Sequence, residues 1–191
     1  MIQLKKIILA SASPRRRELL GNLGVEYECF SPRVEEKGLS EKDGKAVVSY
    51  NALVKAKSLK REGYAIIGAD TAVYLGEKGY GKPENEEEAV LFLKELSGKT
   101  HSVYTGVAVI TEEKELVSVV ETAVTFRALT DGEIMHYVKS GSPLDKAGAY
   151  GIQDFGSVFV ERINGDYFNV VGLPVQTLHN MLLECDVIKY V

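Results

Sequence analysis

The chain has 191 residues, of which 45% are hydrophobic and 26% charged, and its formal net charge is -4. This composition is typical of a folded globular protein and excludes a disordered one. A net negative charge gives no support to a nucleic-acid-binding surface. No apolar run approaches the roughly 20 residues of a membrane-spanning helix, and the apolar stretch near the N-terminus is too short for a signal peptide. We therefore expect a cytoplasmic protein with no nucleic-acid or membrane partner.

Strands and helices alternate through the first half of the chain. Short apolar or alternating runs predict strands, and apolar residues at helical spacing predict helices. The predicted strands are residues 7–10, 25–30 and 65–75, and the predicted helices are residues 13–23, 44–60 and 85–96. Gly68, Ala69 and Asp70 interrupt the third strand, and Asp70 is expected at the end of an apolar run, where ligands of α/β sheets collect.

The second half is richer in predicted strands. Residues 101–111 and 116–129 contain β-branched runs, and residues 130–140 predict a helix in which Thr130 and Glu133 form a capping box. Asn164-Gly165 predicts a hairpin between strands at residues 157–163 and 167–171, and residues 174–183 predict a last helix. The pattern favours an α/β fold with a mixed sheet, and because no repeat or linker interrupts it we expect one domain over residues 1–191.

The helix at residue 13 begins unusually. Ser13 and Pro14 suit a helix cap and first turn, but Arg15, Arg16 and Arg17 follow at the end of the helix that already carries partial positive charge. One interpretation is a phosphate site built from free backbone N–H groups and guanidinium groups, and the other is a solvated basic face. The chain has neither a Walker A loop nor a G-x-G-x-x-G pattern.

Three further residues are candidates for chemistry. Lys55 falls on the apolar stripe of its helix, where it either reaches water or points at an anion in a cleft. Asp70 suits a general base or a metal ligand, or else caps a turn. Lys82, in a Gly- and Pro-containing turn, is either a ligand or simply solvated.

Other side chains could complete such a site. Glu36 belongs to an acidic pair that is either surface charge or the second carboxylate of a Mg²⁺ site. Gln153 follows a Gly- and Ala-rich segment and could present its amide to the edge of a base. The two cysteines, Cys29 and Cys185, lack metal-binding spacing, so we interpret both as buried or inert thiols. The three histidines show no zinc spacing.

Several stretches, taken in order, resemble the Maf family of nucleoside triphosphate pyrophosphatases, which is related in fold to inosine triphosphate pyrophosphatases. They are LASASPRR (9–16), VEE (34–36), KA at Lys55, GADT (68–71), GKP (81–83), LSGKTHSVYTGV (96–107), PLDKAGAYGIQ (143–153) and NGDYFNVVGLP (164–174). The resemblance implies an elongated mixed sheet flanked by helices, with two lobes around a central cleft, in a chain that often forms a homodimer. It also implies hydrolysis between the α- and β-phosphates with a divalent metal cation, Mg²⁺ or Mn²⁺.

The resemblance also implies a role for each matching residue. Asp70 would be the proton acceptor that activates water, and Glu36 would join Asp70 in holding the metal. The residues implied to bind substrate are Ser13, Arg15, Arg16, Lys55 and Lys82. The residues implied to set the base preference are Arg15, Thr71 and Gln153.

Subgroups of the family differ just after the proline. The combination of Arg15 with Gln153 resembles enzymes that act on dTTP and UTP, with modified pyrimidine nucleotides as further candidate substrates in a house-cleaning role. A second subgroup has Trp there and prefers 7-methyl-GTP, whereas this chain has no Trp. Two alternatives stay open: a pyrophosphatase with a different base preference, and a nucleotide-binding regulator of septum formation that acts through a partner. A pure sensor would not need Asp70 as a base.

Overall fold

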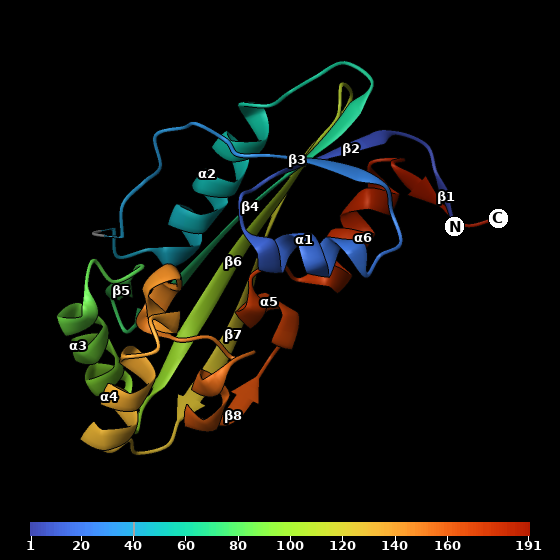
Figure 1. Cartoon of the computed structure of the whole chain (residues 1–191). Coiled ribbons are helices and arrows are strands. Elements are labelled where there is room, and N and C mark those ends of the chain that lie inside the picture. Colours follow the sequence, from blue (N-terminus) through green and yellow to red (C-terminus); the bar gives the residue numbers. More distant parts are fainter. Residues whose placement is uncertain (40) are drawn as a thin grey trace.

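A computed structural model describes residues 1–39 and 41–191, and its centre is a mixed sheet (Figure 1). Within the described residues the strands lie in the order β3-β2-β4-β6-β7-β8, with β5 added to β4. β2 is parallel to β3 and β4, whereas the pairs β4–β6, β6–β7 and β7–β8 are antiparallel. The strands are β2 (Lys6–Ala10), β3 (Tyr27–Phe30), β4 (Tyr64–Leu75), β5 (Lys78–Tyr80), β6 (Thr100–Ile110), β7 (Glu115–Phe126) and β8 (Val160–Asn164).

Alternate residues of the long strands face different helices. On one face, Ile8, Ile66 and Ala108 pack against α2 (Gly44–Lys57). On the other face, Leu9 and Ile67 belong to a core cluster with residues of α1 (Pro14–Gly21) and α6 (Val175–Glu184). A small second sheet, β1 (Ile2–Gln3) paired with β9 (Ile188–Lys189), places the two termini side by side next to this cluster (Figure 1).

A second core cluster lies farther along the same long strands and forms the other lobe. Val73 and Val103 pack there with residues of α3 (Glu86–Leu96) and α4 (Asp131–Val138). The short helices η1 (Ser142–Asp145), η2 (Ala147–Ala149) and η3 (Phe155–Phe159) complete this lobe, and α5 (Tyr167–Val171) leads back to the first. Because the two clusters use the same face of β4 and β6, the molecule has two lobes along one elongated sheet, as predicted.

Two glycines bring α2 directly onto the sheet. A Cβ atom on Gly68 would lie 2.1 Å from the Ala52 carbonyl oxygen, and one on Gly106 would lie 2.2 Å from that of Val48. Any side chain at these positions would push the helix away from β4 and β6. This close packing brings the inner face of α2 within reach of Asp70, which is paired with Gly106 in the sheet.

Two predictions about the elements were wrong. The hairpin at Asn164-Gly165 does not form, because Asp166 caps α5 by accepting a hydrogen bond of 2.8 Å from the Phe168 amide, and β8 pairs with β7 instead. The strand at residues 65–75 is also not interrupted at Asp70, since β4 runs on to Leu75. The capping box of Thr130 and Glu133 is confirmed. None of the described helices is long and apolar enough to span a bilayer.

Candidate active site

The candidate site lies at a gap along one edge of β4. β2 pairs with β4 only as far as Ala10 opposite Gly68, and β5 pairs with it only from Tyr80 opposite Val73. Among the described strands, none is paired to residues 69–72 on that edge. Asp70 contacts α2 on one face of the sheet, while Thr71 contacts α1 on the other. The gap therefore lets one cleft reach both faces.

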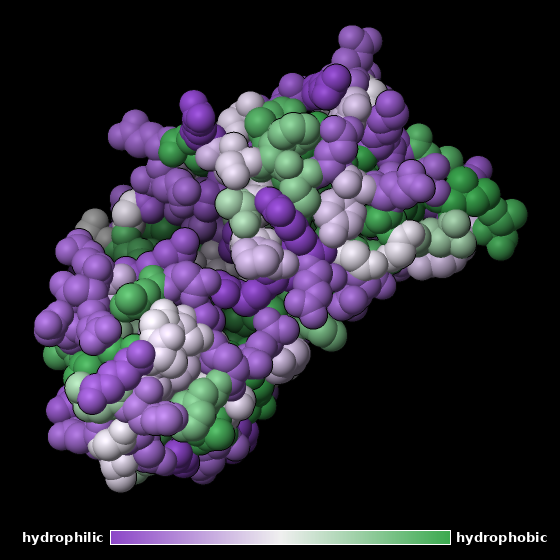
Figure 2. Space-filling model, in the orientation of Figure 1, coloured by the Kyte–Doolittle hydropathy of each residue, from purple (hydrophilic) through white to green (hydrophobic). Residues whose placement is uncertain are grey.

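A cleft of about 450 Å³ lies at this gap, between the two lobes. Hydrophilic side chains gather around the middle of the molecule, where the lobes meet (Figure 2). The cleft brings together every residue that the sequence suggested for the site, namely Ser13, Arg15, Arg16, Glu36, Lys55, Asp70, Thr71, Lys82 and Gln153. Their common location agrees with the predicted site, and their individual roles are taken up below as proposals.

Asp70, Lys55 and Glu36 form a charged cluster on the α2 side of the cleft. The Lys55 ammonium lies 2.7 Å from Oδ1 of Asp70 and 2.8 Å from Oε2 of Glu36. The side chains of Lys55 and Asp70 are only 9% and 14% exposed. A carboxylate and an ammonium can both be buried here because each compensates the charge of the other.

Asn51 is a site residue that the sequence analysis missed. It is buried one turn before Lys55, and its amide donates to Oδ2 of Asp70 at 3.0 Å. The same side chain accepts a hydrogen bond of 2.7 Å from the Lys37 amide and donates to the Lys37 carbonyl at 3.2 Å. Asn51 thus fixes both Asp70 and the loop that carries Glu36. The available signal was a polar residue at i-4 from Lys55 on the same helix face.

The Arg16 side chain lies on the face of the sheet opposite α2. Its guanidinium donates to the Gly172 carbonyl at 2.8 Å, to Thr71 Oγ1 at 3.0 Å and to Ser11 Oγ at 3.5 Å. Burial lowers the pKa of Arg16 from its usual value, while the negative charge of Asp70 opposes that shift. Ser13 caps α1 by accepting from the Arg16 amide at 3.5 Å, so the helix start and the guanidinium both belong to the cleft.

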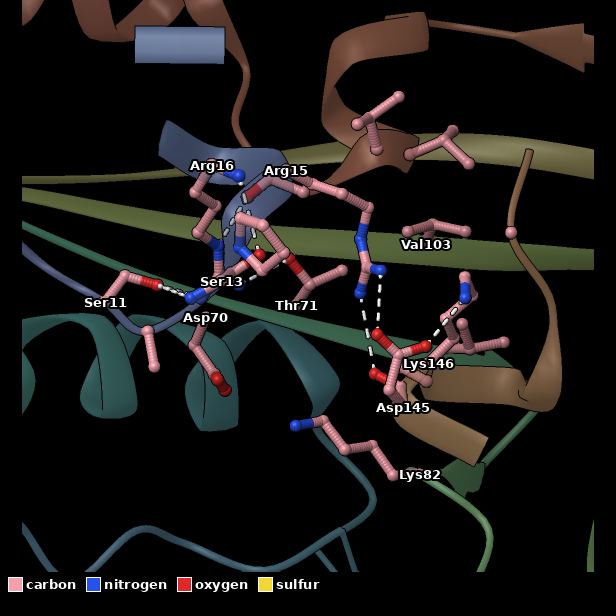
Figure 3. A pocket seen from close by; sticks show the side chains of 18 of the residues that line it. Ser11, Ser13, Arg15, Arg16, Asp70, Thr71, Lys82, Val103, Asp145 and Lys146 are labelled. Atoms are coloured by element: carbon pink, nitrogen blue, oxygen red, sulfur yellow. Dashed lines mark hydrogen bonds and ion pairs between the residues drawn. The ribbon is translucent and has the colours of Figure 1, made fainter. Parts of the chain in front are cut away.

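Arg15 extends toward the second lobe (Figure 3). Its guanidinium forms an ion pair of 3.0 Å with Oδ2 of Asp145. Both arginines therefore have acceptors in the cleft, and the carboxylate of Asp145 offsets the charge of Arg15. Lys82 points into the same space from the opposite wall, and no hydrogen bond or ion pair joins its ammonium to another described residue (Figure 3). Gln153 is exposed in a turn on the second lobe.

The part of the cleft on the Thr71 face has an apolar floor. Val73, Val103 and Tyr150 line it. Behind the floor, His101 is buried, and its Nε2 lies 2.8 Å from the Tyr150 hydroxyl. Burial lowers the pKa of His101 to about 4, so the imidazole is neutral near pH 7. This pair holds the Tyr150 ring in place.

Two carboxylates could hold a metal ion. No group of three or more His, Cys, Asp or Glu lies together among the residues that the structure describes. Glu36 and Asp70 nevertheless converge on one point, because both contact the same Lys55 ammonium. Mg²⁺ prefers oxygen ligands and usually takes one or two carboxylates together with substrate phosphates. The two carboxylates therefore suit a hard divalent cation whose remaining ligands would come from the phosphates of a bound nucleotide.

The two cysteines lie outside this cleft. Both are free, Cys185 is buried and Cys29 is partly buried. Desolvation raises the pKa of both thiols above the usual value. The interpretation as buried or unreactive thiols is therefore confirmed for Cys185 and agrees with the partial burial of Cys29.

The fold and the cleft define an α/β protein with a two-lobed mixed sheet and a cation-rich central cleft. Solved structures of the same fold are a HAM1 protein from Coxiella burnetii (TM-score 0.55, 17% identity, covering 94% of this chain and 99% of that one) and the Ham1 protein of Staphylococcus aureus (TM-score 0.52, 17% identity, 95% and 100%). These similarities confirm the predicted fold class.

The chain belongs to the Maf family, since the model of the Maf-like protein family matches residues 6–185. A relative from Dictyoglomus turgidum, named dTTP/UTP pyrophosphatase, is 49% identical over 183 residues, which cover 93% of this chain and 95% of the relative. Proteins of the same name from Aquifex aeolicus and Bacillus cereus are 45% and 47% identical, each with 96% of this chain and 97% of the relative covered. The resemblance found in the sequence is confirmed.

Proposed function

We propose that this chain hydrolyses dTTP and UTP between the α- and β-phosphates and releases the nucleoside monophosphate and pyrophosphate. The observation that carries the proposal is a partly buried carboxylate, Asp70, in one cleft with four cationic side chains, Arg15, Arg16, Lys55 and Lys82. The names of the relatives, at 45–49% identity over almost the whole chain, support the same activity. The cytoplasm, where nucleotides are abundant, is the proposed location.

The cations are suited to a triphosphate. Arg16 and the start of α1 line the cleft from one lobe, and Lys82 faces it from the other wall. Backbone N–H groups at a helix start and guanidinium groups both bind phosphate oxygens well. Fixed cations of this kind also stabilise the charge that develops on the leaving pyrophosphate.

Asp70 is the proposed general base. Lys55 and Asn51 hold its two oxygens at 2.7 and 3.0 Å, which fixes the carboxylate while leaving lone pairs for a water molecule. A carboxylate held in this way can take a proton from water as the water attacks the α-phosphorus. The leaving group is then pyrophosphate, whose charge Lys82 and the arginines compensate.

Glu36 and Asp70 are the proposed ligands of a Mg²⁺ or Mn²⁺ ion. When bound, such an ion would neutralise phosphate charge and favour the ionised form of a nearby water. Lys55 lies between these two carboxylates in the present structure, so it keeps their charge compensated before substrate arrives.

Base recognition is assigned to the second lobe. Gln153 offers both a donor and an acceptor, which matches the O4 and N3–H of uracil and thymine. Cytosine has an amino group in place of O4 and no proton on N3, so it would leave polar groups unpaired. Thr71 and Arg15 complete the proposed specificity set.

A nucleotide panel tests the proposal. The purified protein is assayed with Mg²⁺ or Mn²⁺ on dTTP, UTP, CTP, ATP, GTP and 7-methyl-GTP, and ion chromatography separates pyrophosphate from orthophosphate. We expect pyrophosphate as the first product and the highest kcat/KM for dTTP and UTP. Nucleoside diphosphate plus orthophosphate would refute the reaction, and equal kcat/KM for UTP and CTP would refute the base assignment. Light scattering on the same sample tests the homodimer that the family resemblance implies.

A further inference from the structure

Asp145 joins the two walls of the cleft. It lies in η1 on the second lobe, whereas Arg15 lies in α1 on the first. Arg15 donates through Nη1 to Oδ2 of Asp145 at 3.0 Å and through Nη2 to the Asp145 carbonyl at 3.5 Å. Two contacts from one guanidinium restrict its position far more than a single ion pair between flexible side chains would.

The other carboxylate oxygen of Asp145, Oδ1, also accepts a hydrogen bond. Lys146 donates to Oδ1 at 2.6 Å, and the same ammonium donates to the Ser142 carbonyl at 2.5 Å. Lys146 also lies 3.4 Å from Asp154, which accepts hydrogen bonds from Ser142 at 2.7 Å and from Tyr137 at 2.8 Å. The carboxylate that holds Arg15 is therefore part of a connected polar network in the second lobe.

That network reaches the segment that carries Gln153, because Asp154 is the next residue in the chain. Partial burial alone would raise the pKa of Asp145, but the hydrogen bonds from Lys146 and Arg15 outweigh burial and hold that pKa below its usual value. Asp145 is thus ionised near pH 7. A negative charge beside an anionic substrate is unfavourable by itself, so another role must offset it.

We propose that Asp145 is a positioning residue that holds the Arg15 guanidinium where it meets the nucleotide and so raises substrate affinity. The proposal rests on the proposed function, since Arg15 is taken to contact the substrate. Asp145 itself touches Arg15, and the guanidinium keeps further N–H groups free for a ligand.

Replacement of Asp145 distinguishes a positioning role from a purely electrostatic effect on substrate binding. If Asp145 were only a nearby negative charge, Asp145→Ala would lower KM, because an anionic substrate would bind more strongly. If Asp145 positions Arg15, Asp145→Ala raises KM by about tenfold with little change in kcat, as expected for the loss of one charge-assisted contact. Asp145→Asn, which keeps an acceptor for Arg15 but loses the charge, should give an intermediate KM.

A double-mutant cycle with Arg15→Ala completes the test. We expect Arg15→Ala/Asp145→Ala to have the KM of Arg15→Ala alone, because Asp145 acts through Arg15. Asp131→Ala is the matched control: it removes one exposed carboxylate that pairs with Lys94 at 3.0 Å outside the cleft lining, and KM should stay unchanged. A lower KM in Asp145→Ala, or additive effects in the cycle, would overturn the proposal.

The cycle is measured on whichever nucleotide the unmodified protein cleaves best, with Kd for its α,β-imido analogue from calorimetry as a second readout. A wrong base assignment changes the nucleotide chosen and leaves the cycle intact. Additive substitutions would refute the role of Asp145 while leaving the hydrolase assignment intact. The side chain of Asp145 is 60% exposed, so its replacement should not prevent folding, and thermal unfolding of each variant checks this.

Discussion

Asp70 is the residue whose replacement tests the chemistry most directly. Asp70→Asn keeps the size of the side chain and a contact to Asn51 but removes the carboxylate. Lys55 keeps Glu36 as a partner at 2.8 Å, so the folded state should survive. We expect kcat to fall by about 10² to 10⁴, the usual cost of losing a general base.

Asp43→Asn is the control for that experiment. Asp43 caps α2 by accepting from the Lys45 amide at 3.0 Å, and Asn caps helices about equally well. The same chemical change outside the cleft should leave turnover near normal. Near-normal turnover of a folded Asp70→Asn protein would instead exclude Asp70 as the general base.

The burial of the His101 imidazole predicts how the stability of the protein depends on pH. Burial lowers its pKa to about 4 in the folded protein, whereas an unfolded chain has a pKa near 6.5. Between these values the unfolded chain binds more protons, so stability falls as the pH falls from about 6.5 to about 4. From pH 7 to pH 5 this group alone should remove about 2 kcal/mol of the free energy of unfolding.

Urea unfolding at both pH values measures this effect. His101→Gln does not titrate in this range, so the loss between pH 7 and pH 5 should shrink by about 2 kcal/mol relative to the unmodified protein. An identical loss in both proteins would contradict the assignment of His101 as a buried neutral imidazole.

The helix α2 and the strands beneath it give a prediction at the scale of elements. Gly68→Ala would place a Cβ atom 2.1 Å from the Ala52 carbonyl oxygen, so either α2 or β4 must move. We expect destabilisation of about 1–3 kcal/mol, as for other overpacked cores. Because α2 carries Lys55 and Asn51, turnover should also fall, and denaturant unfolding together with the standard assay measures both.

Gly132→Ala is the matched control for that change. Gly132 lies in α4, and a Cβ atom there would be 4.0 Å from its nearest neighbour, Thr130 Oγ1. Ala stabilises a helix relative to Gly by up to about 1 kcal/mol, so the control should shift stability in the opposite direction. Equal stability of Gly68→Ala and the unmodified protein would show that α2 can move off the sheet without cost.

Local sequence patterns predicted most of these elements, because the residues within each element determine whether it forms. The capped start of α1, the capping box of α4 and the long apolar strands depend on neighbours in the chain, and all of them form. The predicted hairpin failed because its outcome depended on a distant strand: β7 pairs with β8, and Asp166 is free to start a helix.

The same distinction applies to the site. Its cations and carboxylates stood in recognisable motifs, and all of them line the cleft. The only local signal for Asn51 was its position one turn before Lys55. Its contacts and those of the His101–Tyr150 pair join segments 14 to 49 residues apart, so their roles do not follow from local patterns. That Asp70 lies in mid-strand beside a gap also depends on where β2 and β5 end.

At the scale of the whole molecule, a nucleotide should join the two lobes. The proposed phosphate contacts come from α1, α2 and Lys82, and the proposed base contact, Gln153, comes from the second lobe. A ligand at 100 times its Kd stabilises the folded state by about 2.7 kcal/mol. For a chain of this length we expect α,β-imido-UTP to raise Tm by roughly 5–10 °C.

Differential scanning fluorimetry measures that shift. Arg16→Ala should bind the analogue more weakly and show a smaller shift at the same concentration, because it loses a charge-assisted phosphate contact. An analogue that binds by calorimetry but leaves Tm unchanged would mean that it also binds the unfolded chain.

Neighbouring positions of β4 point to opposite faces of the sheet, and this has a consequence for how the family could diversify. Asp70 meets Lys55 and Asn51 on one face, while Thr71 meets Arg16 and Thr105 on the other. Substitutions that enlarge or reshape the floor around Val73 and Val103 can accumulate without disturbing the Asp70 carboxylate on the opposite face of the sheet. A library randomised at such positions should therefore yield new nucleotide preferences far more readily than loss of hydrolysis. One face of β4 can thus keep the residues that carry out the reaction, while substitutions on its other face change which substrate is accepted.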